Sequence, residues 1–159
     1  LLLHVLSDHR WSDRNWRLAF FGKGPMRHNV ERLISMYGLE DRVTLGGFSD
    51  GVEALWADHH MLVQPSRHEG LPLTVVEAMM CGRPVLATDV AGHNEVIEDG
   101  VTGFLAESAT VTSIGRALDC AWRRRGDLQA MGMAGARRIR SLMPHDAASV
   151  FADDVLRLC

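Results

Sequence analysis

The chain alternates short apolar runs with helical segments, and this alternation constrains its fold more than any other feature. The runs are apolar throughout rather than on every second residue, which is typical of strands buried on both faces of a parallel sheet. Segments with the periodicity of amphipathic helices lie between these runs. The pattern predicts an α/β fold, a Rossmann-like parallel sheet flanked by helices. The predicted strands lie at residues 16–21, 42–45, 60–64, 84–88 and 103–105.

Amphipathic helices are predicted between these strands and after the last one. A helix that contains Val30 and Ile34 is expected to end where Gly38 can form a C-terminal cap. Either Ser49 or Asp50 can cap the helix that follows. The other helices are expected at residues 1–7, at 73–81 and, as three C-terminal helices with the third restarting at Pro144, within about 110–159.

Composition limits the class of protein. The 159 residues suit one domain, residues 1–159, and 47% of them are hydrophobic, as in ordinary globular proteins. The net charge of -3 gives no argument for a nucleic-acid partner. Cys81, Cys120 and Cys159 lack the spacing of a disulfide framework or of a zinc site, so a reducing cytoplasm and no metal are expected.

Two observations bear on where such a protein works. No segment approaches the roughly 20 apolar residues that span a bilayer, and the start at Leu1 resembles no signal peptide, so the chain looks cut from a longer one. The arginines at 123–125 and at 137, 138 and 140 are either solvated helix faces or a contact for anionic lipid. The expected location is the cytoplasm, with the inner face of the membrane as the variant that the basic groups would favour.

Glu69 and Glu77 form the candidate binding site. They lie eight residues apart around a Gly-Leu-Pro turn, and Pro72 suits the first position of a helix. Backbone donors at Leu73 and Thr74 would then point out of the helix end toward a phosphate. Glu77 would lie in an apolar segment, where a ligand diol would satisfy its charge. The alternative is structural: such pairs arise by chance, and Glu77 can pair with Arg83.

Loops that follow the strands should gather at one edge of the sheet, because ligands of parallel sheets bind beyond the carboxyl ends of the strands. Four loops with unusual composition qualify, at residues 22–25, 46–48, 66–72 and 89–94. The glycines at 22 and 24 do not fit a P-loop or a dinucleotide fingerprint. Lys23 is either a solvated side chain or a phosphate contact.

The segment 65–89, Pro-Ser-Arg-His-Glu-Gly-Leu-Pro-Leu-Thr-Val-Val-Glu-Ala-Met-Met-Cys-Gly-Arg-Pro-Val-Leu-Ala-Thr-Asp, closely resembles the signature of retaining group 1 glycosyltransferases, also called family 4. The likeness continues through residues 91–97 and 99–105 and, upstream, through 22–25 and 39–43. It covers nearly the whole chain. The resemblance implies the C-terminal, donor-binding half of a GT-B enzyme, with an acceptor-binding domain of the same parent protein before Leu1.

The resemblance also implies roles for residues. Glu69 would hold the donor sugar and support charge at its anomeric carbon, and Glu77 would bind the ribose. Amides of Gly70 and Leu71 would face the sugar, while those of Leu73 and Thr74 would meet the distal phosphate. The remaining expected contacts of the nucleotide are Gly22, Gly24, Gly47 and Phe48. The donor would be a UDP-, GDP- or ADP-sugar, and neither a cofactor nor a metal is expected.

The family pattern further implies a strand that this chain lacks. The first strand of the domain, with an Arg and a Lys after it that contact the diphosphate, would lie between the strands at 16–21 and 60–64. Those two strands should therefore not pair directly. Two other functions stay open from the sequence: a GT-B nucleotide-sugar epimerase, and a nucleotide-sugar-binding module without catalysis.

Overall fold

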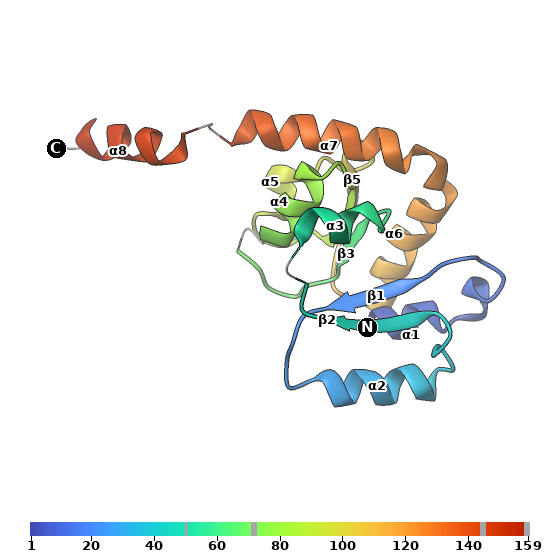
Figure 1. Ribbon diagram of the computed structural model, residues 1–159. Coiled ribbons are helices and arrows are strands. Elements are labelled where there is room, and N and C mark those ends of the chain that lie inside the picture. Colours follow the sequence, from blue (N-terminus) through green and yellow to red (C-terminus); the bar gives the residue numbers. More distant parts are fainter. Residues whose placement is uncertain (50, 71–72, 144–145, 158–159) are drawn as a thin grey trace.

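The computed structural model describes residues 1–49, 51–70, 73–143 and 146–157. Its strands and helices alternate as the sequence predicted (Figure 1). In chain order the elements are α1 (Leu2–Leu6), the 3-10 turn η1 (His9–Trp11), β1 (Leu18–Phe21), α2 (Arg27–Met36), β2 (Val43–Gly47), α3 (Val52–Ala57), β3 (Leu62–Gln64), α4 (Leu73–Met80), β4 (Val85–Thr88), α5 (His93–Val96), β5 (Gly103–Ala106), α6 (Val111–Arg123), the 3-10 turn η2 (Arg125–Asp127), α7 (Leu128–Leu142) and α8 (Ala147–Arg157).

The strands form two parallel sheets. One pairs β1 with β2, and the other has the order β3-β4-β5. Within the described residues β1 and β3 do not pair, as expected if another strand belongs between them. Each of these two strands therefore has an open inner edge. The parallel α/β architecture is confirmed, and the position of the missing strand stays a prediction with which the two separate sheets agree.

Both faces of the three-stranded sheet are covered, and β4 shows how. All four of its residues are buried. Because successive side chains of a strand point to opposite faces, Leu86 packs in one cluster with residues of α1 and α6. Val85 and Ala87 pack in a second cluster with α4. This two-sided burial explains why the strand reads as a continuous apolar run.

The two-stranded sheet has a smaller core and also shares one with the other sheet. Leu3 of α1, Ile34 of α2 and Val43 of β2 are buried together. Leu18 and Phe20 of β1 pack against this core and also against the α1–α6 cluster, which receives Met61 and Val63 from the β3 segment. Helices α1 and α6 thus join the two sheets in place of direct strand pairing.

Several local expectations need correction. The strand expected at 42–45 does not stop before the glycines, because β2 continues to Gly47, whose φ of 71° ends it. Helix α3 is preceded by Gly51 without a side-chain cap; Ser49 donates to the Gly51 carbonyl instead, and Asp50 lies outside the described residues. The segment expected as a loop at 89–94 already begins helix α5 at His93.

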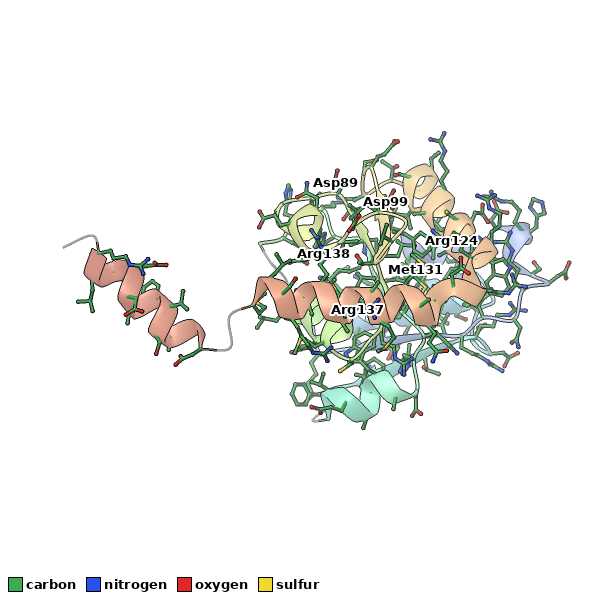
Figure 2. All side chains as sticks on the ribbon, turned by 90° about the horizontal axis from the view of Figure 1, so that it is seen from above. Asp89, Asp99, Arg124, Met131, Arg137 and Arg138 are labelled. Carbon is green, nitrogen blue, oxygen red and sulfur yellow. The ribbon has the colours of Figure 1, made fainter. Side chains whose placement is uncertain are left out.

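Other local expectations are confirmed. Gly38 has a φ of 64°, and its amide donates to the Ser35 carbonyl after α2, as a C-terminal cap does. The three C-terminal helices exist, although Pro144 lies outside the described residues and the last helix, α8, begins at Ala147. Helix α7 crosses the body over α4 and α5, whereas α8 stands away from the rest of the molecule (Figures 1 and 2).

Two arginines in each basic group donate to backbone carbonyls: Arg124 and Arg125 in the first, Arg138 and Arg140 in the second. Arg138 of α7 donates to the Val96 and Glu95 carbonyls of α5, at 2.8 and 3.0 Å. Arg140 reaches the Met80 carbonyl of α4 at 3.1 Å. Such bonds satisfy carbonyls that a helix leaves without an internal partner. These side chains therefore have a structural role, and a contact with lipid stays a prediction.

One observation bears on whether the chain crosses a membrane. Among the helices in the described parts of the chain, none is both long enough and apolar enough to cross a bilayer.

Candidate functional site

Glu69 lies half-buried between β3 and α4 and is held by two neighbours. Ser66 donates its hydroxyl to Oε1 of Glu69 at 2.7 Å, and the Gln64 side-chain amide donates to the same oxygen at 2.9 Å. These two bonds hold the pKa of Glu69 below its usual value of 4.5, although burial acts in the opposite direction. The Coulomb interaction with His93, the smallest contribution, acts in the same direction as the two bonds. The site thus contains a fixed, ionised carboxylate.

The start of α4 connects to this carboxylate through Gln64. Thr74, in the first turn, donates its hydroxyl to the Gln64 side-chain oxygen at 2.8 Å. Gln64 uses both ends of its side-chain amide: its oxygen orients the helix start and its nitrogen orients Glu69. Leu73 is 73% exposed, so the first residue of α4 faces open space. A ligand can therefore approach this helix end, where the backbone donors attract an anion.

Glu77 lies one turn further along α4, half-buried, between the buried Val75 and Ala78. The structural alternative for this residue was a pair with Arg83. Within the described residues no such ion pair forms, because the Arg83 guanidinium donates to the Trp56 and Ala57 carbonyls at the end of α3. The specific alternative that the sequence offered for Glu77 is therefore wrong.

A second group of predicted residues meets at the ends of β1 and β2. The amide of Gly22 donates to the Gly47 carbonyl, and both glycines have positive φ, 123° and 71°. Phe48 is 67% exposed, and the Lys23 ammonium lies 5.7 Å from the centre of its ring. This cation–π contact gives Lys23 a partner that neither sequence interpretation named.

A cavity of about 250 Å³ lies beside this loop pair. Residues 20–27 line most of it, including Gly22 and Gly24, and Leu45 of β2 and Val30 of α2 complete the wall. The loops thus gather at the carboxyl ends of the strands within each sheet. Across the two sheets, the ring of Phe21 at the end of β1 packs edge-on against His59 at 5.4 Å.

The remaining predicted residues are placed as follows. Gly70 is exposed, and open space surrounds the position where a side chain would begin. Leu71 and Pro72 lie outside the described residues. In the described parts of the chain there is no group of three or more His, Cys, Asp or Glu that would hold a metal ion. Metal independence remains a prediction.

Sequence reasoning missed the residues that hold Glu69. Gln64 and Ser66 were assigned to a strand end and a loop without a role, and Thr88 and His93 were not singled out. A usable signal did exist: Gln64 and Thr88 are polar residues that end apolar strands, and such positions face the ligand edge of a parallel sheet. Both side chains lie in the hydrogen-bond network around Glu69.

Comparison with known proteins identifies the family. Residues 1–123 match the family described as glycosyl transferases group 1. The chain belongs to this family.

Two curated proteins are similar to different shares of the chain. Alpha-D-kanosaminyltransferase of Streptomyces kanamyceticus is 39% identical over 94 residues, which are 58% of this chain and 24% of that protein. An exopolysaccharide phosphotransferase of Streptomyces coelicolor is 34% identical over 154 residues, 96% of this chain but 15% of that protein. The chain thus spans a quarter or less of the length of these two relatives.

Solved structures show the same fold. Sucrose-phosphate synthase from Thermosynechococcus elongatus superposes with a TM-score of 0.84 at 24% identity, over 99% of this chain and 41% of that one. Anabaena HepE, solved in complex with UDP, superposes with a TM-score of 0.85 at 20% identity, over 99% of this chain and 44% of that one. The group 1 chain therefore has the α/β arrangement found in part of each of these larger proteins.

Proposed function

We propose that this chain is the donor-binding domain of a retaining, family 4 glycosyltransferase of the GT-B type. It binds a UDP-, GDP- or ADP-sugar and, together with an acceptor-binding domain of the same protein, transfers the hexosyl group to an acceptor. The observation that carries the proposal is the linkage of Glu69 through Gln64 to Thr74 at the start of α4. This linkage sets an ionised carboxylate beside an anion-binding helix end.

Each part of this arrangement suits one part of a nucleotide sugar. Glu69 accepts hydrogen bonds from the sugar hydroxyls and stabilises positive charge that develops at the anomeric carbon. The helix end at Leu73 and Thr74 receives the distal phosphate, whose negative charge grows as the bond to the sugar breaks. Glu77, further along the same helix, binds the ribose hydroxyls. The amides of Gly70 and Leu71 complete the sugar contact.

The loops at the other sheet suit the nucleoside. Gly22 and Gly47 bring two loop backbones into contact without side chains, and Gly24 continues the first of them. Phe48 offers an exposed ring on which a base can stack. The cavity of about 250 Å³ at these loops has room for part of a nucleotide. HepE, which shares the fold, was solved with UDP and with UDP and glucose.

The first experiment tests binding. Melting of the complete natural protein is followed with UDP, GDP and ADP, and one of the three is expected to raise the melting temperature. Glu77→Gln should reduce that shift, because an amide offers a diol one neutral acceptor oxygen where a carboxylate offers two charged ones. Glu53→Gln, an exposed carboxylate on α3, is the matched control. Equal shifts in Glu77→Gln and the parent would remove Glu77 from the ribose site.

The second experiment separates transfer from the two other functions. The protein is incubated with nucleotide sugars labelled in the sugar, and the products are separated. Transfer to an added glycan or lipid acceptor with retained anomeric configuration supports the proposal. Conversion of the donor into its epimer without transfer indicates an epimerase. Binding with the donor recovered intact indicates a module without catalysis.

A further inference from the structure

A buried histidine lies next to the Glu69 network and has no assigned role. His93, the first residue of α5, is fully buried. Its Nδ1 lies 2.7 Å from the Thr88 carbonyl, which can only accept, so this nitrogen carries a proton. Within the described residues its other ring nitrogen, Nε2, is buried without a hydrogen-bond partner. An unpaired buried nitrogen costs free energy, so packing alone does not account for this side chain.

The bond from His93 to the Thr88 carbonyl is the first of three contacts, called here the relay, which pass through the backbones of Thr88 and Ser66 and end at the carboxylate. Thr88, the last residue of β4, is itself fully buried and donates its hydroxyl to the Ser66 carbonyl. Ser66 then donates its own hydroxyl to Oε1 of Glu69 at 2.7 Å. The relay joins the β4–α5 segment to the loop after β3, which are neighbours because β3 and β4 pair in parallel.

We infer that His93 is a positioning residue, which fixes the end of β4 so that Thr88 and Ser66 hold Glu69 in the orientation that the donor sugar requires. This inference rests on the proposed function of Glu69. His93 does not touch the donor; it acts through the two hydroxyls. Gln64 holds the same carboxylate oxygen from the other side, so the loss of the relay loosens Glu69 without releasing it.

Three variants isolate the relay. His93→Leu removes both ring nitrogens and keeps an apolar side chain of similar size, whereas His93→Asn can keep a donor near the position of Nδ1. Thr88→Val removes only the hydroxyl from a side chain of nearly the same shape. Ile97→Val, which trims a fully buried residue just after α5, is the control for a general loss of packing.

The first measurement is turnover of the complete natural protein with UDP-glucose, GDP-mannose and ADP-glucose, followed by release of the nucleoside diphosphate. We expect kcat to fall roughly tenfold in His93→Leu and in Thr88→Val, while the dissociation constant of the free nucleoside diphosphate stays within about twofold. His93→Asn should recover most of kcat. The double variant of His93→Leu and Thr88→Val should be no worse than either single one, because both interrupt one relay.

The second measurement does not need turnover. The Glu69 carboxyl is titrated by NMR with labelled glutamate. Its pKa should be higher in Thr88→Val than in the parent, and higher in His93→Leu than in His93→Asn, two variants that both lack the imidazole ring. An unchanged pKa across these variants would overturn the relay.

The outcomes separate the two proposals. Turnover in the parent together with full kcat in His93→Leu would overturn the role of His93 and leave the proposed function standing. Equal loss of kcat in Ile97→Val, or equal loss of nucleotide affinity in His93→Leu, would show that His93 acts only through stability. A parent that turns over none of the three donors counts against the proposed function, and the titration still decides whether the relay exists.

Discussion

Gln64 donates its side-chain amide to Glu69 over 2.9 Å, so the last residue of β3 fixes the orientation of a carboxylate five residues later in the chain. The same side chain accepts from Thr74 in α4. A rigid strand thus orients both the helix start and the loop in front of it. This arrangement favours a preorganised site over one that forms only when the ligand binds.

The first prediction concerns the charge of Glu69. Ser66→Ala removes the largest cause of its lowered pKa, so the pKa measured by NMR should rise toward 4.5. Because the pKa is lower in the folded state, the associated stabilisation is present above the unfolded value and is lost as the pH falls through the folded value. The drop in unfolding free energy between neutral pH and about pH 3 should therefore be smaller in Ser66→Ala.

Ser141→Ala is the control for this prediction, since the Ser141 hydroxyl donates to the Arg138 carbonyl and not to a carboxylate. A Glu69 pKa that is the same in Ser66→Ala and in Ser141→Ala would contradict the assignment of the shift to Ser66.

The second prediction concerns the packing of α7 against the turn after α4. A Cβ at Gly132 would lie 1.9 Å from the Gly82 carbonyl oxygen, a backbone atom that cannot move aside. Gly132→Ala should lower the free energy of unfolding by roughly 2–4 kcal/mol. On the same helix, a Cβ at Gly135 would meet its nearest neighbours at 3.5 Å or more. Gly135→Ala should be neutral or stabilise by up to about 1 kcal/mol, as alanine does in helices.

Chemical denaturation of both variants tests the opposite signs. Equal effects at the two positions would show that α7 does not lie as close to the Gly82 turn as the structure places it.

The third prediction concerns arginines as helix caps. Arg138→Met removes two hydrogen bonds to the end of α5 and should cost about 1–2 kcal/mol of stability. Arg137, its exposed neighbour on α7, is the matched control (Figure 2). Arg137→Met changes the net charge equally and should stay within about 0.5 kcal/mol of the parent. Similar losses of unfolding free energy in both variants, measured by denaturation, would mean that the loss of charge and not of hydrogen bonds destabilises Arg138→Met.

The fourth prediction concerns the open strand edges. The amide of Leu18 donates toward β2 and that of Leu62 toward β4. Since successive amides alternate sides, those of Ala19 and Val63 point toward the space between the two sheets. In this 159-residue chain, hydrogen exchange should be fast at Ala19 and Val63 and slow at Leu18 and Leu62. Protection of all four amides would mean that another segment fills the space.

The strands and the main helices could be predicted because their signals are local. Apolar runs such as the one around Leu86 and caps such as Gly38 follow from the residues themselves. The bonds of Gln64 and Ser66 to Glu69 lie within one short window and were missed. The contact of Thr88 with Ser66 could not be predicted locally, because it depends on the pairing of β3 with β4. The predicted pairing of Glu77 with Arg83 is wrong for a related reason, because Arg83 donates to carbonyls that lie 26 and 27 residues away in the chain.

The core shared by the two sheets also has a consequence for synthesis of the protein. Leu18 and Phe20 of β1 pack against a core to which α6, about a hundred residues later in the chain, contributes. During translation the first sheet must therefore wait, with apolar side chains and strand edges uncovered, until α6 has left the ribosome. A truncation before Val111 would leave these apolar side chains without part of their core and prone to aggregation.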